Sequence, residues 1–490
     1  MAAGAPAPIG GGQAPPAATA GGWAQLTARR DAGKSPAALF ITGLTWEGLP
    51  RDVARRAVMC VIDTLGAMLA GRGARAARIA AETAAAWWPA PEAHLIAHGG
   101  RAAALGAAFA NAVAANAVDV DDIGIYTWGH PGAQVVPAAL ALAEREHLDG
   151  REFLLSVVVG YEIAFRAGRC LNFAASHVSS AERTFRACGS WGALACAAIA
   201  CRVLRADAES TRHALGIAEY HSPDLPMMRD LESPAMVKHG VGPGALTGLL
   251  AADLALRGFT GIPSSLDLPQ FRSFASDLGR RYLLPHGITW KRFACCAWAH
   301  PALLAVEKLL ARHEITPGMI GKILVETYPD ALRLGTAVPA TTEEAQFSLA
   351  WPIAALILDR QVGPAQVLGR ALSSAAHADL CSRVEARVSA ELTRLYDLSE
   401  RNDPAGKDAA VVTITLTDGR ALSSGLVEHV LYPEPGWAEE EITRKFAWLA
   451  AGHLAPSTID EITAELLDLE RVRDIADLMA RLAPALRSAW

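Results

Sequence analysis

An excess of basic residues is missing from this chain. Its 45 Lys and Arg residues are outnumbered by 51 Asp and Glu residues, which leaves a formal net charge of −6 at pH 7. Without a general positive field, nonspecific attraction to nucleic acid or to anionic lipid is excluded. An anionic substrate would therefore need a local cluster of Lys, Arg and His side chains inside a site.

Closely spaced cysteine pairs are also missing. The eight cysteines of the 490-residue chain form no CxxC pair and none of the spacings that bind zinc. In a chain of this length they do not indicate a disulfide framework, and a reducing compartment is the better match. We therefore expect a cytoplasmic protein.

Long hydrophobic runs are absent too. No apolar run reaches the roughly 18 residues of a membrane-spanning helix, and the best candidate, 244–261, is interrupted by Asp253 and Arg257. The first 22 residues contain no charged residue and no continuous apolar core, so they do not resemble a signal peptide. We expect no membrane partner, no nucleic-acid partner, and a disordered Ala/Gly/Pro-rich tail over 1–30.

What the chain does contain is Ala and Leu at helical spacing. With 51% hydrophobic residues it can bury a large core, and its length predicts more than one domain. Val58, Ile62 and Leu65 recur three or four residues apart. The Ala-rich stretch 102–118 would let helices approach closely. We predict a helical domain over 31–287.

The character of the sequence changes near residue 288. Lys322–Tyr328 alternates as a half-buried strand does, and Val411–Thr417 is followed by Asp418-Gly419, a turn signal of β-hairpins. We predict a smaller α+β lid domain over 288–432. Helical sequence returns afterwards, so 433–490 is expected to complete the first domain. The predicted fold class is mainly α, with a discontinuous helical domain and an α+β lid.

The first segment with candidate chemistry is acidic. Asp119, Asp121 and Asp122 follow the Ala-rich stretch, and three carboxylates in four residues are costly to bury without cationic or donating partners. His130 precedes Pro131-Gly132, a predicted tight turn that can aim an imidazole, the usual acid–base group near neutral pH, into a cleft. A solvated acidic loop with a structural histidine is the alternative. No second ligand cluster supports a metal site.

Basic residues mark three further segments. Arg183 and Arg186 precede a Gly-rich helix start, where free N–H groups and the helix dipole favour anions. Lys238 precedes another small-residue helix, where it would neutralise a substrate carboxylate. Lys291 opens segment 291–296, near the predicted domain junction. Ordinary exposed arginines and lysines remain the alternative for each.

The vicinal pair Cys295-Cys296 closes the last of these segments. A redox or nucleophilic role would need a cationic setting for a thiolate, which the sequence does not demonstrate. Buried small thiols are therefore the favoured interpretation of both cysteines.

Taken together, these segments resemble the MmgE/PrpD family. The resembling stretches include NAVAANAVDVDD, GHPGAQVVPAALALAE, GSWGALACAA, MVKHG, KRFACC and QFSLAWPIAA, and they follow the family's order over about 100–360. The resemblance implies a large helical domain completed by the C-terminus, a smaller α+β lid, and a site between them. It also implies a homodimer and chemistry without a metal or an organic cofactor.

The resemblance carries roles to individual residues. The first Asp of the family's DxDD falls on Asp119, and the His of its HPxG falls on His130. The Lys of its MxK motif falls on Lys238, and the Lys that opens its K-x-Y/F-x-C-C motif falls on Lys291. His130, Asp119 and Lys238 are then expected to be catalytic. The residues expected to bind substrate are Lys291, Arg183, Arg186 and Cys296.

Three positions depart from the family pattern. Ile123 stands where members commonly carry Thr, Arg183 where many carry His, and Ala297 where Arg is often found. Cis-aconitate decarboxylases can carry His at the position of Cys296. The departures keep the anion-binding pattern but leave the substrate undefined.

The implied function is a cofactor-independent lyase that acts on a small polycarboxylate. Negative charge builds up beside a carboxylate when a proton or CO2 leaves, so Lys238, Lys291 and Arg183 are expected to stabilise it in a dry cleft. His130 is the preferred proton donor or acceptor, while Asp119 either orients His130 or a lysine or acts as the base itself.

Several activities fit these groups. Dehydration of a 2-methylcitrate-like acid ranks ahead of decarboxylation of a cis-aconitate-like acid. An isomerase or epimerase is the second interpretation, because removing and returning a proton uses the same groups. A non-catalytic polycarboxylate-binding protein is the third.

Overall fold

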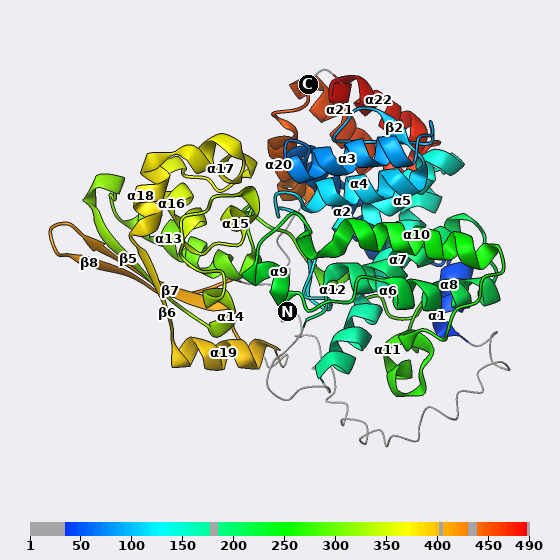
Figure 1. Cartoon of the computed structure of the whole chain (residues 1–490), viewed down its shortest axis with the longest axis horizontal. Coiled ribbons are helices and arrows are strands. Elements are labelled where there is room, and N and C mark those ends of the chain that lie inside the picture. Colours follow the sequence, from blue (N-terminus) through cyan, green and yellow to red (C-terminus); the bar gives the residue numbers. More distant parts are fainter. Residues whose placement is uncertain (1–34, 177–184, 401–404, 430–438, 488–490) are drawn as a thin grey trace, which may run out of the picture.

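The computed structural model describes residues 35–176, 185–400, 405–429 and 439–487. Within these residues the protein is mainly α-helical, with a smaller α+β region beside a larger helical body (Figure 1). The predicted fold class is therefore confirmed. The tail expected over 1–30 lies outside the described residues. Among the helices so described, none is both long and apolar enough to cross a bilayer.

The helical body is built from both ends of the chain. Its helices are α1 (Pro36–Gly43), α2 (Arg51–Gly71), α3 (Arg75–Trp87), α4 (Ala104–Asn116), α5 (Gly132–Glu146), α6 (Gly150–Ser176), α7 (Cys188–Val203), α8 (Ala208–His221), α9 (Met228–Glu232), α10 (Val241–Leu256), α11 (Arg272–Ala275), α12 (Leu284–Gly287), α20 (Glu439–Ala450), α21 (Pro456–Leu467) and α22 (Ile475–Arg487). Two short antiparallel ladders, which the sequence analysis did not predict, join β1 (Ala93–His94) to β2 (Arg101–Ala102) and β3 (Ile123–Gly124) to β4 (Ile288–Thr289).

The α+β region contains a four-stranded sheet in the order β6-β5-β7-β8. The strands are β5 (Ile320–Thr327), β6 (Val384–Val388), β7 (Ala409–Leu416) and β8 (Ala421–Glu428). Strand β5 pairs in parallel with β6 and antiparallel with β7, and the predicted hairpin is present as β7–β8. The helices of this region are α13 (His300–Arg312), α14 (Pro329–Leu332), α15 (Thr342–Gln346), α16 (Ala350–Asp359), α17 (Pro364–Val367), α18 (Ala375–Ser382) and α19 (Ala390–Glu400).

Two hydrophobic cores underlie this arrangement. The larger core draws its buried residues from 37–290 and 442–486, and the smaller core draws mainly on 293–416. Val118 and Val120, which flank Asp119, belong to the smaller core although they follow a helix of the body. The acidic segment therefore lies where the two cores meet. The boundaries near 288 and 432 remain a prediction.

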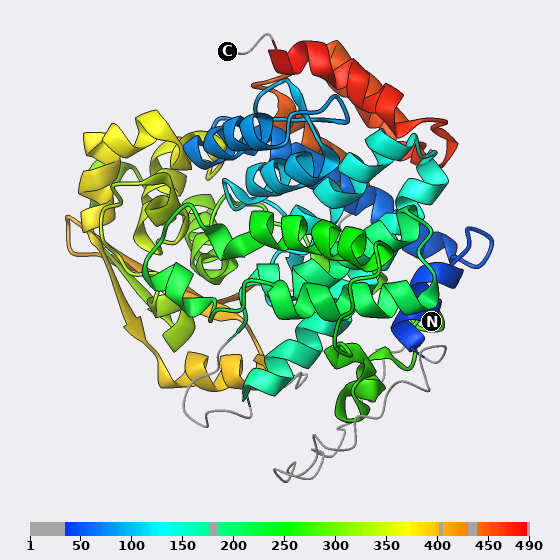
Figure 2. The ribbon, with the colours of Figure 1, turned by 45° about the vertical axis from the view of Figure 1, so that its right-hand side comes forward.

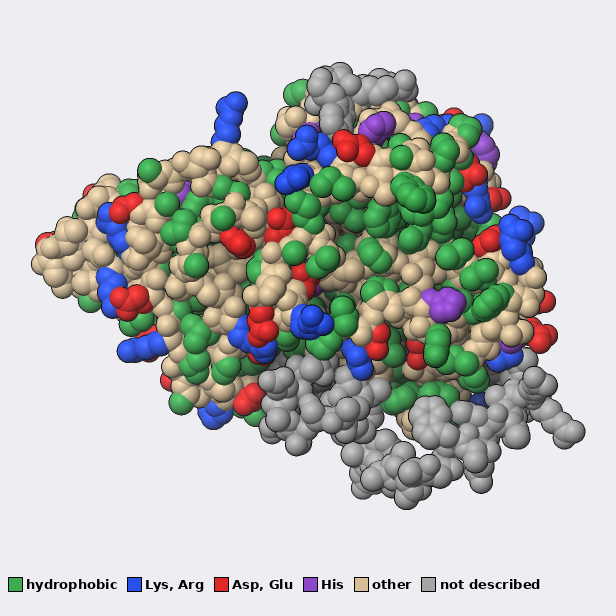
Figure 3. Space-filling view, viewed as in Figure 1, with side chains coloured by type: hydrophobic (Ala, Val, Ile, Leu, Met, Phe, Trp, Pro, Cys, Tyr) green, Lys and Arg blue, Asp and Glu red, His purple; other side chains and the backbone are tan. Residues whose placement is uncertain are grey.

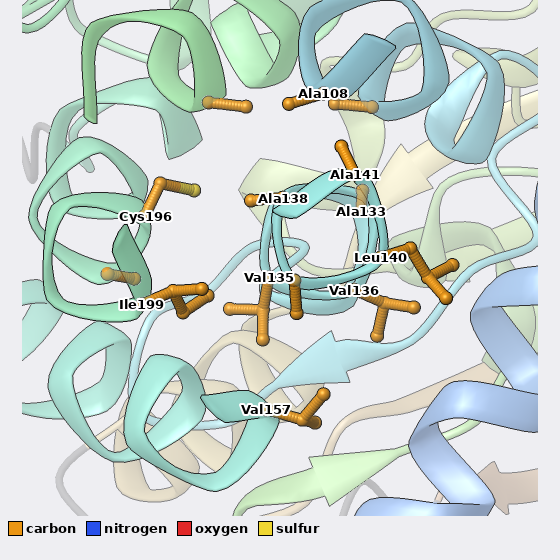
Figure 4. Packing of buried hydrophobic residues seen from close by; sticks show 14 of the residues in the cluster. Ala108, Ala133, Val135, Val136, Ala138, Leu140, Ala141, Val157, Cys196 and Ile199 are labelled. Atoms are coloured by element: carbon orange, nitrogen blue, oxygen red, sulfur yellow. The ribbon is translucent and has the colours of Figure 1, made fainter. Parts of the chain in front are cut away.

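Helix α5 runs through the centre of the body. All its residues from Gly132 to Glu144 are buried, and Figure 4 shows its side chains, such as Ala138 and Val135, surrounded by residues of neighbouring helices, such as Ala108 of α4 and Ile199 of α7. Glycine is required where it begins, because a Cβ at Gly132 would lie 2.6 Å from Thr64 Oγ1 and 2.8 Å from Asp122 Oδ1. This close packing fixes the position of His130, two residues before the helix.

The C-terminal helices complete the body. Figure 2 shows α20–α22, in orange and red, beside the blue N-terminal helices. Phe446 and Leu449 of α20 pack against Gly66 of α2, where a Cβ would already lie 3.3 Å from each side chain. Lys445 of α20 is buried and donates a hydrogen bond of 2.8 Å to the carbonyl oxygen of Val120. The C-terminal part of the chain thus contacts the acidic segment directly, through Lys445.

Candidate active site

Short backbone ladders bring the acidic segment to Lys291. Ile123 of β3 pairs with Thr289 of β4, two residues before Lys291. The main-chain N–H of Gly124 also donates to the carbonyl oxygen of Gly129 at 2.8 Å, which closes a loop just before His130. Three segments separated in sequence are therefore held together by main-chain hydrogen bonds.

A left-handed turn places Lys238 and His239 beside this loop. Lys238, His239 and Gly240 have φ values of 35°, 57° and 68°, and α10 begins at the next residue. Asp119 is left-handed as well, with φ of 53°. This conformation costs roughly 1–2 kcal/mol for a residue with a Cβ, and such strain concentrates at functional sites. Gly189 of α7 allows this turn to pack closely against the helix, because a Cβ at position 189 would overlap the carbonyl oxygen of Gly240.

Asp119 is the centre of a buried charge cluster. Its Oδ2 lies 3.0 Å from Lys291 Nζ, and its Oδ1 lies 3.6 Å from Lys238 Nζ and 3.4 Å from His130 Nε2. These four residues are between 0 and 7% exposed. The structure thus brings together the four residues that the resemblance singled out.

Further hydrogen bonds fix the two lysines. Lys291 Nζ also donates to the main-chain oxygen of Asp119 at 3.0 Å. Lys238 Nζ donates to Gln346 Oε1 at 2.7 Å and lies 4.6 Å from the centre of the Phe347 ring. Gln346 in turn donates through Nε2 to Ala117 O at 3.0 Å. Lys238 is therefore anchored to the α+β region as well as to Asp119.

The opposite charges decide the protonation of this cluster. Burial by itself would raise the pKa of Asp119, but Lys238 and Lys291 outweigh it and hold that pKa well below its usual value. Burial lowers the pKa of Lys291, yet Asp119 and Asp121 raise it above its ordinary value overall. Asp119 is therefore a carboxylate and Lys291 an ammonium group at neutral pH.

Two stacked imidazoles lie beside the carboxylate. The rings of His130 and His239 are 5.5 Å apart with an interplanar angle of 11°. His130 Nδ1 lies 3.0 Å from the carbonyl oxygen of Asp122 and 3.2 Å from Asp121 Oδ2. His239 Nδ1 lies 3.0 Å from Asp230 Oδ2, and burial lowers the pKa of His239 despite that carboxylate. His239 is therefore neutral at neutral pH.

A second acidic layer lies behind the first. Asp122 Oδ1 accepts from the Gly132 N–H at 2.9 Å and its Oδ2 from the Tyr161 hydroxyl at 2.6 Å. Burial and the charge of Asp63 raise the pKa of Asp122 to about 8. Burial raises the pKa of Asp63 to about 6, although its partner Lys445 opposes this. At neutral pH Asp122 therefore keeps its proton, which limits the buried negative charge.

Asp122 gives a prediction on pH and stability. Its pKa rises from 3.8 to about 8 on folding, so the stability that its proton contributes is complete below pH 3.8 and is lost as pH rises to about 8. The variant Asp122→Asn mimics the protonated acid. We expect its stability, relative to wild type, to improve by about 1–4 kcal/mol between pH 5 and pH 8.

Denaturant unfolding at both pH values measures this change. Asp253→Asn is the matched control, because Asp253 is half exposed on α10 and forms an ion pair with the exposed Arg257. A difference between Asp122→Asn and wild type that is the same at pH 5 and pH 8 would contradict the prediction.

A pocket opens in front of these groups. It contains about 890 Å³ of empty space, including its mouth. His130, His239, Lys291 and Cys296 line it, whereas Asp119 and Lys238 lie behind these lining residues. Lys238 therefore does not line the pocket and acts on it only through its contact with Asp119. The departures Ile123 and Ala297 noted in the sequence also line the wall.

The two arginines that were predicted to bind substrate are not placed in the pocket by the described residues. Arg183 lies outside the described residues. Arg186 is described, but its Nη1 pairs with Asp224 Oδ1 at 3.0 Å, its side chain is 26% exposed, and it does not line the pocket. Its role in substrate binding stays a prediction without support from the geometry.

Three residues of the site were not predicted from the sequence. His239 follows Lys238 directly, so the same MVKHG stretch contained the signal. Gln346 begins the QFSLAWPIAA stretch but was not singled out. Asp408, just before β7, lines the pocket from the α+β region, and no local pattern marks it. Each of the three joins the site through contacts between segments that are distant in the sequence.

Asp119, His130 and His239 form a possible set of metal ligands. Their ligand atoms lie within 4.8 Å of one another. However, Lys291 and Lys238 place two ammonium groups at 3.0 and 3.6 Å from the Asp119 oxygens. A divalent cation on this carboxylate would meet strong like-charge repulsion in a buried setting. The donor set therefore fits proton transfer and anion binding better than a resident metal ion.

The vicinal cysteines do not provide a ready nucleophile. Burial raises the pKa of Cys296 to about 12 and that of Cys295 well above its usual value, although Lys291 opposes the shift for both. All eight cysteines are free thiols. Cys296 thus contributes a neutral, partly exposed surface to the pocket.

Comparison with known proteins agrees with this architecture. A cis-aconitate decarboxylase of Aspergillus terreus is 24% identical to the chain, over 90% of this chain and 94% of its own length. A cis-aconitate decarboxylase-like protein, oryM, of Aspergillus oryzae is also 24% identical, over 91% and 96%. The MmgE/PrpD N-terminal domain matches residues 37–272, and the MmgE/PrpD C-terminal domain matches residues 293–469. Because these two matches cover most of its length, the chain belongs to the MmgE/PrpD family.

Proposed function

We propose that this protein is a lyase that acts on a small polycarboxylate without a metal or organic cofactor. Decarboxylation of an unsaturated acid related to cis-aconitate is the favoured reaction, because the relatives reported above carry the name cis-aconitate decarboxylase. The family membership supports a lyase-like role, and the site supplies groups for it.

One observation carries this proposal. Lys291, His130 and His239 line the pocket, and the buried carboxylate of Asp119 lies behind them between two lysines. Lys291 binds a substrate carboxylate and stabilises negative charge that develops beside it. Asp119 keeps Lys291 and His130 in place and so acts as a positioning residue.

We assign different tasks to the two imidazoles from their contacts. His130 has oxygen atoms near both ring nitrogens, at 3.0 Å on Nδ1 and 3.4 Å on Nε2. Because His130 also lines the pocket, we assign it the role of proton donor. His239 is neutral and turns Nδ1 toward Asp230, so Nε2 is left as the proton acceptor.

Decarboxylation requires only one of these tasks. The bond to the departing carboxylate breaks, CO2 leaves, and the electron pair remains on the carbon chain beside a second carboxylate. Lys291 stabilises the resulting charge, and a proton from His130 adds to carbon. Lys238, held by Gln346 and Asp119, preserves the geometry of the cluster.

Dehydration is the second candidate, and the stacked imidazoles favour it. One group must remove a proton from carbon while another protonates the leaving hydroxyl, and His239 and His130 lie 5.5 Å apart, centre to centre. The same pair would serve an isomerase or epimerase, which removes and returns a proton.

A substrate panel tests the proposal. We expect the full-length chain, assayed with a chelator present, to consume at least one tricarboxylate from a panel of cis-aconitate, citrate and 2-methylcitrate. NMR separates loss of CO2 from loss of water and from inversion alone. Thermal stabilisation by these acids without turnover would identify a non-catalytic binding protein and refute the lyase.

The oligomeric state and location remain predictions. We propose a homodimer, as the family resemblance implies. Hydrophobic side chains gather on the face of the helical body seen in Figure 3, which is compatible with a partner there. The cytoplasmic location expected from the cysteines is likewise a prediction.

A further inference from the structure

His130 lies between two buried carboxylates, and the proposed function gives a task to only one of them. Its Nε2 is 3.4 Å from Asp119 Oδ1, and its other ring nitrogen, Nδ1, is 3.2 Å from Asp121 Oδ2. We propose that Asp121 is a second positioning residue, which keeps the His130 ring protonated so that Nε2 delivers the proton. This inference rests on the proposed function, since it takes His130 as the proton donor.

The first argument is the hydrogen that Nδ1 of His130 carries. This nitrogen lies 3.0 Å from the main-chain oxygen of Asp122. A carbonyl oxygen only accepts, so this contact is a hydrogen bond when Nδ1 bears the hydrogen. Nε2 is then the nitrogen that gains or loses the exchangeable proton. The carboxylate of Asp121 beside the Nδ1–H group favours the form of the ring in which both nitrogens are protonated.

The second argument is the negative charge of Asp121. Burial by itself would raise the pKa of Asp121, but His130 and then Lys291 outweigh burial and lower that pKa overall. Asp121 is therefore a carboxylate at neutral pH, and an opposite charge this close favours the charged form of an imidazole. The charge of Asp119, by comparison, is shared with the ammonium groups of Lys291 and Lys238, at 3.0 and 3.6 Å.

The third argument is that neighbouring helices hold Asp121 in place. Asn116, the last residue of α4, donates through Nδ2 to both carboxylate oxygens of Asp121, at 2.9 and 3.2 Å. Both residues are 0% exposed. Lys445 of α20 holds the preceding main-chain oxygen, that of Val120, at 2.8 Å. Because the carboxylate is fixed before any substrate binds, it stabilises the charged imidazole without reorganisation.

The other titratable groups near His130 affect its charge in known directions. Within the described parts of the chain they are Asp119 and Asp122 of the same loop, Cys188 of α7, His239 before α10 and Lys291 after β4. Burial raises the pKa of Asp122 to about 8 and that of Cys188 to about 12, and it lowers the pKa of His239, so these three are neutral at pH 7. Lys291 opposes a charge on His130, whereas Asp119 and Asp121 favour it.

Nitrogen NMR of the full-length chain, labelled at histidine, tests the proposal without any substrate. At pH 7 we expect both ring nitrogens of His130, assigned by their loss in His130→Asn, to show the shifts of a protonated ring. In Asp121→Asn one nitrogen should show the shift of an unprotonated atom. Asp122→Asn is the matched control and should keep the wild-type pattern, because Asp122 is already neutral at this pH. A neutral His130 in wild type, or a protonated ring in Asp121→Asn, overturns the proposal.

Turnover of an acid found by the substrate panel gives a second readout. Asp121 does not line the pocket, so Asp121→Asn should lower kcat by at least about 10²-fold and leave KM within about threefold of wild type. The alkaline limb of kcat/KM should move to lower pH, by about one pH unit or more, since Nε2 loses its proton more easily. A lower kcat with an unchanged pH profile would identify a purely structural role and overturn the proposal.

A milder variant covers the case in which Asp121→Asn does not fold. Asn116→Ala keeps the carboxylate of Asp121 but removes the two hydrogen bonds that hold it. We expect the same direction of change with a smaller size, namely a several-fold lower kcat and a shorter move of the alkaline limb. An Asn116→Ala profile identical to that of wild type would overturn the proposal.

The outcome is separable from that of the proposed lyase, because the nitrogen shifts need no turnover. Failure of the substrate panel together with the expected shifts would refute catalysis but support the pairing of Asp121 with a protonated His130. Lyase turnover together with a protonated ring in Asp121→Asn would support catalysis and refute the role of Asp121.

Discussion

Replacing Asp119 by alanine is expected to lower the free energy of unfolding by about 3–5 kcal/mol, because it leaves buried ammonium groups without their counter-charge. Lys291 and Lys238 are 1% and 2% exposed on the side chain, and the carboxylate contacts both at 3.0 and 3.6 Å. Denaturant unfolding at pH 7 measures the loss. Turnover of any substrate found by the panel should fall with it, since Lys291 and His130 lose their common anchor.

Two comparisons show whether the buried charges cause this effect. Asp253→Ala breaks an exposed ion pair with Arg257, and such pairs contribute only about 0–1 kcal/mol. The double variant Asp119→Ala/Lys291→Met removes one of the unmatched ammonium groups, so we expect it to be more stable than Asp119→Ala alone. If Asp119→Ala is no more harmful than Asp253→Ala, the electrostatic account of the site is wrong.

Replacing His130 by asparagine is expected to lower kcat by about 10²–10⁴-fold, the usual contribution of general acid–base catalysis. This change removes the proposed donor, which every candidate reaction uses, whereas His239→Asn removes the proposed acceptor and should have an effect of this size only for dehydration or isomerisation. His147→Asn is the matched control, because His147 is exposed at the end of α5 and contacts Asp474. Full turnover in His130→Asn would refute its assignment.

The pH profile separates the two roles. Burial lowers the pKa of His239 below 6.5, so its accepting form is already dominant at pH 6.5 and is lost as the pH falls further. For a reaction that uses the acceptor, kcat/KM should decline on the acid side as His239 gains a proton. This acid decline should disappear in His239→Asn. A decarboxylation that needs only His130 would lack the dependence on His239, which makes the profile informative about the reaction as well.

The strand and hairpin predictions show which elements a local sequence pattern can predict. Val411–Thr417 and the following Asp418-Gly419 predicted the β7–β8 hairpin, because alternation and turn chemistry are local properties. By contrast, β3 and β4 are two residues long and join positions 123 and 289. No local pattern identifies such a pair, yet it brings Lys291 to Asp119.

The site residues divide in the same way. Asp119, His130, Lys238 and Lys291 were found from ordered motifs, since each lies in a stretch that resembles the family. Asp408 reaches the pocket from the α+β region, through a contact that depends on how the two cores meet. The sequence alone therefore does not place the Asp408 side chain in the pocket.

By itself, the sequence determined the mainly α fold class, the α+β region, the family and the four residues Asp119, His130, Lys238 and Lys291 at the centre of the site. Their residue types and order are written along the chain, and helical or strand spacing depends on near neighbours only. The tertiary structure alone decided which of these residues face the pocket, that His239 joins His130, and that Lys238 and Asp119 lie behind them. Those features arise from burial and from contacts between distant segments, which set the charges and the space that a substrate meets.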